Sequence, residues 1–89
     1  MAWTIEFDDK AIKQLKKLGD TQPKRIRHYL HTRIKPLDDA RQQGRALQGP
    51  EFNHLRRYKV GDYRIICDIQ DHRLVVLVIE IGHRSQIYR

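Results

Sequence analysis

The first residues of the chain alternate between apolar and polar side chains, and the pattern then changes to a helical period. The alternation predicts a half-buried strand over residues 2–7, with its apolar side formed by Trp3, Ile5 and Phe7. The next segment repeats its apolar residues at helical spacing, in a stripe made of Ala11, Ile12, Leu15 and Leu18. Asp8 or Asp9 can cap this helix, and Gly19 can end it. The chain is therefore predicted to begin with a strand followed by an amphipathic helix.

A second helix is predicted after a short turn. Asp20 or Thr21 can cap it. Pro23 lies in its first turn, where the backbone N–H groups have no partner within the helix, so the lack of an N–H on proline costs nothing. Its apolar stripe is thin, comprising Ile26, Leu30 and Ile34, and most of its other positions are basic. Pro36 is expected to end it. A helix with so narrow an apolar side covers a sheet from one side only.

The segment of residues 37–50 is predicted to be a loop with one short turn around residues 39–43. It is interrupted by the helix- and strand-breaking residues Gly44, Gly49 and Pro50. Three strands are predicted after it, at residues 52–60, 63–70 and 73–81. Gly61-Asp62 and Asp71-His72 supply the turns between them, and residues 85–89 are expected to form a short tail.

The order of these elements predicts a single α+β domain over residues 1–89. It consists of an N-terminal strand, a two-helix hairpin and a three-strand antiparallel meander, with the helices packed on one face of the sheet. The strand parity assigns to the helix-covered face Tyr63, Ile65, Cys67 and Ile69. Arg56 has the parity of the core side, so its strand is predicted to be an edge strand or to be covered by a partner. The opposite face is left free for function.

The composition narrows the classes of partner. The 89 residues include 18 Lys and Arg against 11 Asp and Glu, a formal charge of +7 with an isoelectric point near 9.9. Such a charge favours nucleic acid, an anionic surface or an acidic protein as the partner. The single cysteine excludes an intrachain disulfide, and no Cys/His spacing resembles a metal site, so neither metal nor cofactor is expected. No apolar segment long enough for a signal peptide or a membrane span is found, and a reducing cytoplasm is favoured.

The candidate site is a group of cations on the free face, closed from one end by residues that follow the last strand. Arg57 and Lys59 share a strand face, and the turn at Gly61-Asp62 brings Arg64 beside them. The expected group is Arg57, Lys59, Arg64, His83, Arg84 and Tyr88. RNA cleavage needs a base for the 2′-hydroxyl, cations for the charge on the phosphorane and an acid for the leaving oxygen.

These residue types can fill the roles of base, charge stabiliser and acid, but they are also typical of a surface that only binds an anionic ligand. Arginine binds phosphate bidentately, histidine suits proton transfer near neutral pH, and tyrosine can donate a proton or stack on a base. No Gly-rich phosphate loop, carboxylate pair or nucleophile triad is present in the sequence. A basic binding surface without catalysis fits the same pattern.

The chain resembles toxins of the RelE/ParE superfamily, the toxic half of bacterial type II toxin–antitoxin pairs, and more closely its RelE-like side. The resemblance rests on Ile5-Glu6-Phe7, Leu47-Gln48-Gly49, the run from Tyr58 to Arg64, and Ile81-Gly82-His83-Arg84 with Ile87-Tyr88-Arg89. It implies a RelE-like fold and a ribosome-dependent endoribonuclease that cuts mRNA in the A site and inhibits translation. It also implies a cognate RelB-like antitoxin, and a contact with operator DNA only through the antitoxin complex.

The resemblance also implies roles for single residues. Arg57 stands where a catalytic lysine is found, Arg64 at a phosphate-binding arginine, and Arg84 at an arginine that stabilises the transition state. Tyr88 stands at a tyrosine that stacks on or orients the substrate, and His83 at a lysine. The chain departs from the family pattern in that Leu55 replaces another catalytic lysine and the spacing from Arg84 to Tyr88 is shorter. In addition, no helix is predicted at its C-terminal end.

Because a guanidinium stays protonated, Arg57 is a poor base, and the acid/base role is left open between Lys59 and His83. Two other functions remain open. A ParE-like protein inhibits DNA gyrase and is not a nuclease, and a non-toxic basic binding module has neither activity.

Overall fold

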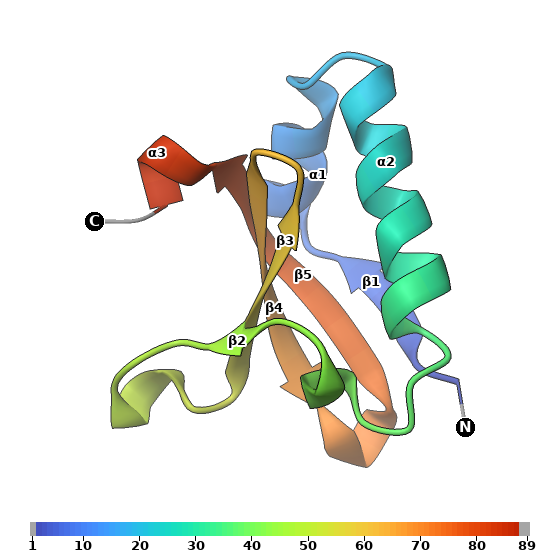
Figure 1. The fold of residues 1–89 in the computed structure, drawn as a ribbon, viewed down its shortest axis with the longest axis vertical. Helices are drawn as coiled ribbons and strands as arrows, with labels where there is room; N and C mark the ends of the chain where they lie inside the picture. Colours follow the sequence, from blue (N-terminus) through green and yellow to red (C-terminus); the bar gives the residue numbers. More distant parts are fainter. Residues whose placement is uncertain (1, 88–89) are drawn as a thin grey trace.

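The computed structural model describes residues 2–87 and has the predicted α+β architecture (Figure 1). The sheet is formed by β1 (Thr4–Phe7), β2 (Arg45–Ala46), β3 (Leu55–Val60), β4 (Tyr63–Gln70) and β5 (Val75–His83), and the helices are α1 (Asp9–Lys16), α2 (Thr21–Tyr29) and α3 (Arg84–Ile87). The strand order is β1-β5-β4-β3-β2, with β1 parallel to β5 and the other neighbours antiparallel. The meander of β3, β4 and β5 thus forms the middle of the sheet.

The helical hairpin forms where the sequence predicts it. Asp8 caps α1, because its carboxylate accepts a hydrogen bond of 2.9 Å from the backbone N–H of Ala11. Gly19 adopts a φ of 81° in the turn after α1, a conformation that glycine adopts without strain. Beyond α2, a π-helical segment over Leu30–Ile34 continues the helix and ends two residues before Pro36.

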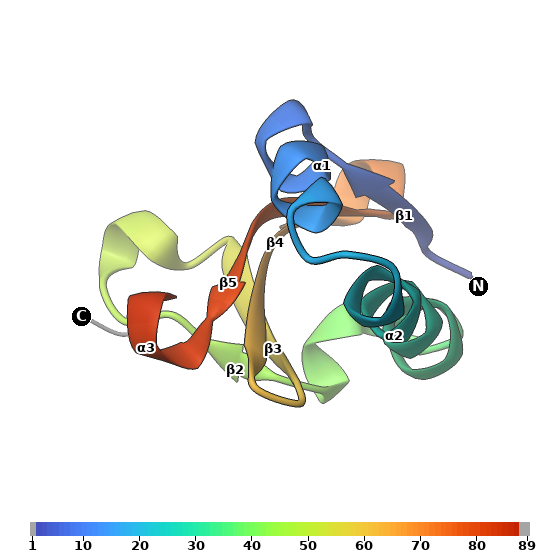
Figure 2. The same cartoon turned by 90° about the horizontal axis from the view of Figure 1, so that it is seen from above.

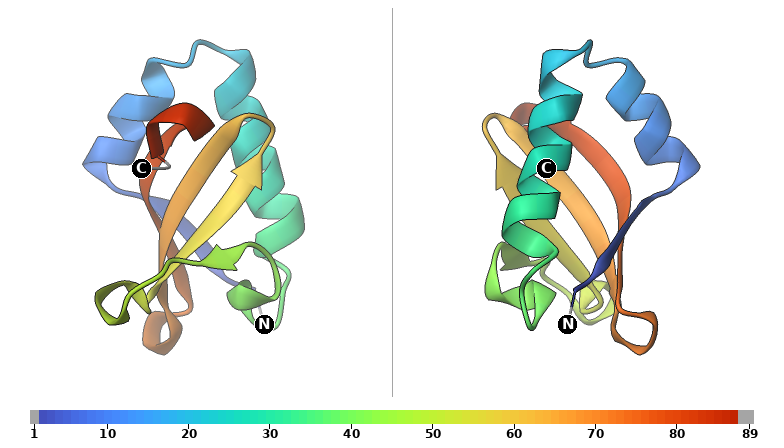
Figure 3. Two further views of the ribbon diagram at one scale, coloured as in Figure 1. Left: turned by 60° about the vertical axis from the view of Figure 1, so that its left-hand side comes forward. Right: turned by 90° about the vertical axis from the view of Figure 1, so that its right-hand side faces the viewer.

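Both long helices cover the same face of the sheet, as Figure 2 shows, while α3 and residues 47–54 lie on the opposite side. In Figure 3, α3 is near one end of the strands and residues 47–54 near the other. The expected layer arrangement is confirmed. None of the helices within residues 2–87 is both long enough and apolar enough to span a bilayer.

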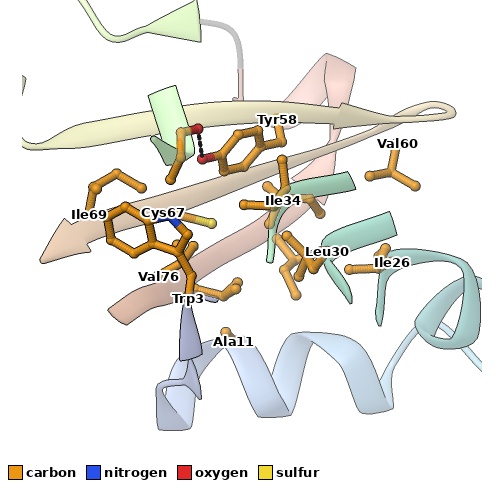
Figure 4. Close-up of a cluster of buried hydrophobic side chains, with 14 of the residues drawn as sticks. Trp3, Ala11, Ile26, Leu30, Ile34, Tyr58, Val60, Cys67, Ile69 and Val76 are labelled. Carbon is orange, nitrogen blue, oxygen red and sulfur yellow. Dashed lines mark hydrogen bonds between the residues drawn. The ribbon is translucent and has the colours of Figure 1, made fainter. Parts of the chain in front are cut away.

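The core lies between the helical hairpin and the sheet (Figure 4). It contains the predicted inward residues Ile65, Cys67 and Ile69 of β4, and Tyr63 packs against its edge. The buried hydroxyl of Tyr58 donates a hydrogen bond of 2.7 Å to the carbonyl of Ala40. Residues from widely separated segments, among them Trp3, Leu15, Ile26, Leu30, Ile34 and Val76, complete one core.

The predicted strands of the meander are shifted at their ends, since β3 begins at Leu55 and β5 runs from Val75 to His83, and two elements were not predicted at all. Residues 45–46 were expected to lie in a loop, but they form the short edge strand β2 beside β3. Residues 85–89 were expected to be a tail without a helix, but α3 begins at Arg84. The start of α3 is held by two contacts from the preceding structure: the Arg84 N–H donates to the carbonyl of Asp62 at 2.9 Å, and the Ser85 N–H donates to Nδ1 of His83 at 3.3 Å. Neither contact is visible in local sequence.

Arg56 is satisfied within the chain, although its parity placed it on the core side. Its guanidinium donates hydrogen bonds to three backbone carbonyls of the 41–44 segment, at Arg41 (2.6 Å), Gln43 (2.9 Å) and Gly44 (3.1 Å). These bonds tie the 41–44 segment to β3. β3 is not the expected edge strand, because β2 pairs with it, and Arg56 is covered by the 41–44 segment of its own chain.

Candidate functional site

Four cations project from the face of the sheet that α1 and α2 leave open. In the strand register, Arg45 of β2 is opposite Arg57 of β3, and Lys59 of β3 is opposite Arg64 of β4. Directly opposed residues place their side chains on the same face, and Arg57 and Lys59 alternate along β3 with the core residues Tyr58 and Val60. We call Arg45, Arg57, Lys59 and Arg64 the cationic face. Like charges on neighbouring strands repel one another, so an anionic ligand would stabilise the arrangement.

Arg64 is the most buried of these cations, with 6% of its surface exposed. Its Nη1 donates to the carbonyls of Gly61 and Tyr63, each at 3.2 Å. Both acceptors belong to the β3–β4 hairpin, so the turn holds the guanidinium in one orientation. Gly61 itself has a φ of 59°, as the predicted two-residue turn requires. The fixed position suits a group that must contact one phosphate oxygen with defined geometry.

The other cations are more open to solvent. Arg45 and Lys59 are exposed, and Arg57 is half-buried. Lys59 is the one amine on the cationic face; the other three members are guanidinium groups. A guanidinium does not give up its proton under ordinary conditions, whereas an amine can. The cationic face thus combines fixed positive charge with one group able to transfer a proton.

Arg45 is the member that the sequence did not predict. Its segment reads as a loop, and a two-residue strand has no periodicity to detect. The available signal was Gly44, which has a φ of 76° and lies so close to the Arg57 carbonyl and the Tyr58 ring that a Cβ atom would not fit. A glycine at that position lets β2 approach β3 and brings Arg45 beside Arg57.

His83 does not join the cationic face, because a β-bulge changes the parity of β5. Cys67 is opposite Val78 but Ile66 is opposite Glu80, so Ile79 is an extra residue on β5. Beyond the bulge, the inward positions become Ile81 and His83. The expectation that His83 closes the same concavity as Arg64 is therefore not met by the structure.

The ring of His83 lies on the α1 side of the sheet. It makes an edge-to-face contact with Tyr63, its register partner, at 5.9 Å between ring centroids and an interplanar angle of 85°. It also lines a pocket of about 400 Å³ together with Gln14, Lys17 and Leu18 of the α1 region. Its Nδ1 contacts the Ser85 hydroxyl at 2.9 Å in addition to the Ser85 N–H.

The remaining two candidates lie at or beyond the end of β5. Arg84 is exposed and begins α3, which is on the open side of the sheet next to the β3–β4 turn (Figure 2). Its backbone bond to Asp62 ties it to that turn. Tyr88 is outside the residues that the structure describes.

An apolar groove adjoins the cationic face on the same side of the sheet. It has a volume of about 440 Å³ and is lined by Leu47, Gln48, Phe52, Leu55, Ile66, Ile79 and Glu80. Leu55 lies on the same side of β3 as Arg57 and Lys59. It stands where the family resemblance implies a lysine, and here it lines the apolar groove. Phe52 is 41% exposed. The open face therefore has a cationic part near the hairpin turn and an apolar part towards residues 47–55.

The buried titratable groups are unsuited to catalysis. Burial raises the pKa of the Cys67 thiol well above its ordinary value, so the thiolate that a nucleophile needs is disfavoured. Burial likewise raises the pKa of the Tyr58 hydroxyl. Within residues 2–87 no three His, Cys, Asp or Glu side chains are grouped so as to bind a metal ion. What the site offers chemically is charge stabilisation and proton transfer by side chains.

Comparison with known proteins finds similarity to bacterial toxins along nearly the whole chain. A family model described as the ParE toxin of type II toxin–antitoxin systems (parDE) matches residues 5–88. The mRNA interferase toxin RelE of Escherichia coli is 29% identical over 90 residues, which cover 99% of this chain and 92% of that protein. The mRNA interferase RelE of Shigella flexneri gives the same values.

Solved structures show the same fold. The toxin–antitoxin complex RelBE2 of Mycobacterium tuberculosis superposes with a TM-score of 0.82 at 20% identity, covering 97% of this chain and 95% of that one. An Escherichia coli RelE variant in complex with an antitoxin RelB peptide gives a TM-score of 0.70 at 24% identity, covering 99% and 92%. The isolated Escherichia coli RelE toxin gives 0.60 at 27% identity, covering 98% and 92%.

Proposed function

Since the chain belongs to the RelE/ParE superfamily of type II toxin–antitoxin toxins, we propose that it is an endoribonuclease that cleaves mRNA in the ribosomal A site and so inhibits translation. The observation that carries this proposal is the cationic face, in which Arg64 is fixed by the hairpin beside Lys59 and next to Arg57. The similarity to two proteins named mRNA interferases supports it. The reaction requires ribosomes, so the proposed place of action is the cytoplasm.

In the proposed mechanism Arg64 binds the scissile phosphate, and Arg57 and Arg84 stabilise the charge that develops on the phosphorane. Preorganised donors of this kind each contribute about 10²–10³ in rate. Lys59 carries the proton from the attacking 2′-hydroxyl to the leaving 5′-oxygen, because it is the amine of the cationic face and His83 lies on the other side of the sheet. Tyr88 is proposed to orient a base of the substrate. Arg45 extends the cationic face along the RNA backbone.

The ribosome is proposed to hold the message in a reactive conformation. A domain of 89 residues with a handful of cations binds phosphates but has few groups for reading bases. Purified protein should therefore cut mRNA on programmed ribosomes and leave the same RNA intact when free in solution. Equal cleavage of free RNA would contradict this division of roles.

The proposed partner that neutralises the toxin is a RelB-like antitoxin, and contact with operator DNA occurs only through their complex. Neighbouring structures from Mycobacterium tuberculosis and Escherichia coli are toxin–antitoxin complexes. An acidic, amphipathic segment over the cationic face or the helices fits the charge of +7. Affinity that falls as salt is added would support an electrostatic contact, whereas salt-independent affinity would indicate an apolar one such as the groove at Leu55 and Phe52.

One observation favours a second candidate function. The family model that matches the chain describes ParE, and a ParE-like toxin inhibits DNA gyrase without cleaving RNA. The two functions differ in their products: cut messages in one case, and gyrase-dependent DNA breaks in the other. A third possibility, a basic binding module, would give neither product.

A further inference from the structure

We propose that the pocket beside His83 is a binding site for one base of single-stranded RNA, separate from the cationic face. The proposal rests on the proposed function only in taking RNA as the natural ligand. The pocket has a volume of about 400 Å³, and six of its lining residues are Gln14, Lys17, Leu18, Tyr63, Ile81 and His83. They come from α1, the α1–α2 turn and the adjoining ends of β4 and β5.

The two aromatic rings of the pocket are held in place by other contacts. His83 packs edge-to-face with Tyr63, and its Nδ1 accepts the Ser85 N–H, so the imidazole caps α3 while it lines the pocket. A ring fixed in this way loses little conformational freedom when a base stacks on it. Stacking on aromatic side chains is a common way to bind single-stranded RNA bases.

Polar groups with matching chemistry lie around these rings. The Gln14 carbonyl oxygen accepts a hydrogen bond of 2.6 Å from the Ile81 N–H, which fixes the side-chain amide and leaves its NH₂ group to donate to a base. Lys17 is exposed and supplies a positive charge for a phosphate. Leu18 and Ile81 add apolar surface. Aromatic rings, an amide donor and an ammonium group together fit a nucleotide.

The pocket is close to the cationic face along the chain but lies on the other side of the sheet. Tyr63 precedes Arg64 on β4, and Gly82, which also lines the pocket, is opposite Arg64 in the register. An RNA strand with a phosphate at Arg64 can therefore place a flanking base in the pocket by crossing the end of the sheet. The pocket would then contribute to the affinity for particular bases and not to bond cleavage.

The direct test is an NMR titration of the isolated chain with AMP, GMP, CMP and UMP, with inorganic phosphate as the comparison. The expected result is saturable shifts of the amides of residues 14–18 and 81–85 with nucleotides but not with phosphate. His83→Asn keeps a cap for α3 but removes the ring, and it should weaken nucleotide binding about fivefold or more. His83→Phe should restore part of the affinity, because it returns an aromatic ring. His72→Ala, an exposed histidine in the β4–β5 turn, is the matched control.

Two results would overturn the proposal. One is the absence of nucleotide-dependent shifts in these segments in the folded wild-type chain. The other is unchanged nucleotide binding by a folded His83→Asn chain, and a kcat for message cleavage lowered a hundredfold in that variant would make His83 an acid or base. The proposal predicts instead a raised KM with kcat preserved. Nucleotide binding in a chain that cleaves no message would leave the pocket assignment standing and refute only the nuclease.

Discussion

Lys59 and Arg64 are register partners across the β3–β4 hairpin, so a lysine and an arginine side chain leave neighbouring strands on the same open face of the sheet. Lys59 is exposed to solvent, whereas Arg64 is 6% exposed and bonded to two carbonyls of the turn. The two cations therefore differ in both chemistry and mobility. In the proposed mechanism the fixed one binds phosphate and the open one moves a proton, which makes their roles separable by substitution.

Replacing Arg64 should lower cleavage strongly. Arg64→Ala is expected to reduce the rate on programmed ribosomes about 10²–10³-fold, because a preorganised donor to the phosphate is lost. Arg64→Lys should recover only part of the rate, since it retains the charge but not the planar fork. Arg73→Ala, which removes an exposed arginine from the β4–β5 turn, should cleave like the wild type.

The partial burial of Arg64 requires a folding control for this experiment. Circular dichroism and a thermal melt of each variant show whether the hairpin still forms. A folded Arg64→Ala chain with wild-type cleavage would remove Arg64 from the site.

Lys59→Arg separates charge from proton transfer. The variant keeps the positive charge but has a group that does not release its proton. We expect binding to programmed ribosomes within about twofold of the wild type and a kcat reduced at least about tenfold, within the range that general acid–base catalysis contributes. Single-turnover cleavage at saturating toxin measures this step. If Lys59→Arg cleaves at the wild-type rate, proton transfer must be assigned elsewhere.

Tyr58→Phe should destabilise the fold without touching the open face. The change leaves the buried carbonyl of Ala40 without its 2.7 Å hydrogen bond, and such a loss costs about 1–3 kcal/mol. Urea denaturation followed by circular dichroism measures the free energy of unfolding. Tyr29→Phe is the matched control, because its ring also packs on Tyr58 but its hydroxyl bonds to no other residue within the described part of the chain. Equal effects of the two changes would show that the Tyr58 hydroxyl contributes little.

Cys67 should make the fold sensitive to alkaline pH. Burial raises its pKa in the folded chain, whereas an unfolded thiol loses its proton near pH 8.5. The folded state then binds more protons than the unfolded state at high pH, so the contribution to stability is complete below about pH 8.5 and declines as the pH rises above that value. Denaturation midpoints measured from about pH 7 to 10 should fall less in Cys67→Ala than in the wild type, although burial of Tyr58 adds to the fall in both. A steeper fall in Cys67→Ala would contradict the prediction.

The sequence predicted β4 and the side of the sheet that faces the helices, because alternation over eight residues is a strong signal and Ile65, Cys67 and Ile69 share one parity. It also placed Arg57, Lys59 and Arg64 on one face, since a two-residue turn fixes the register of a hairpin. These predictions needed only local spacing.

The parts that sequence did not predict depend on contacts between distant residues. β2 forms because Gly44 allows a close approach to Arg57 and Tyr58, and α3 starts on Asp62 and His83. The side of the sheet on which His83 lies depends on the bulge opposite Ile66 and Cys67. No residue type in β5 predicts that bulge. One extra residue moved His83 from the expected site to the α1 side.

The most direct test of the proposed function is primer extension on a translated message incubated with ribosomes and purified toxin, beside an assay for gyrase-dependent DNA breaks. The proposed function predicts cuts within the A-site codon that require ribosomes, vanish when translation is blocked and are lost with Arg64→Ala. Intact messages together with broken DNA would contradict it and assign the protein to the gyrase inhibitors. Intact messages and intact DNA, with a folded chain, would leave a basic binding module.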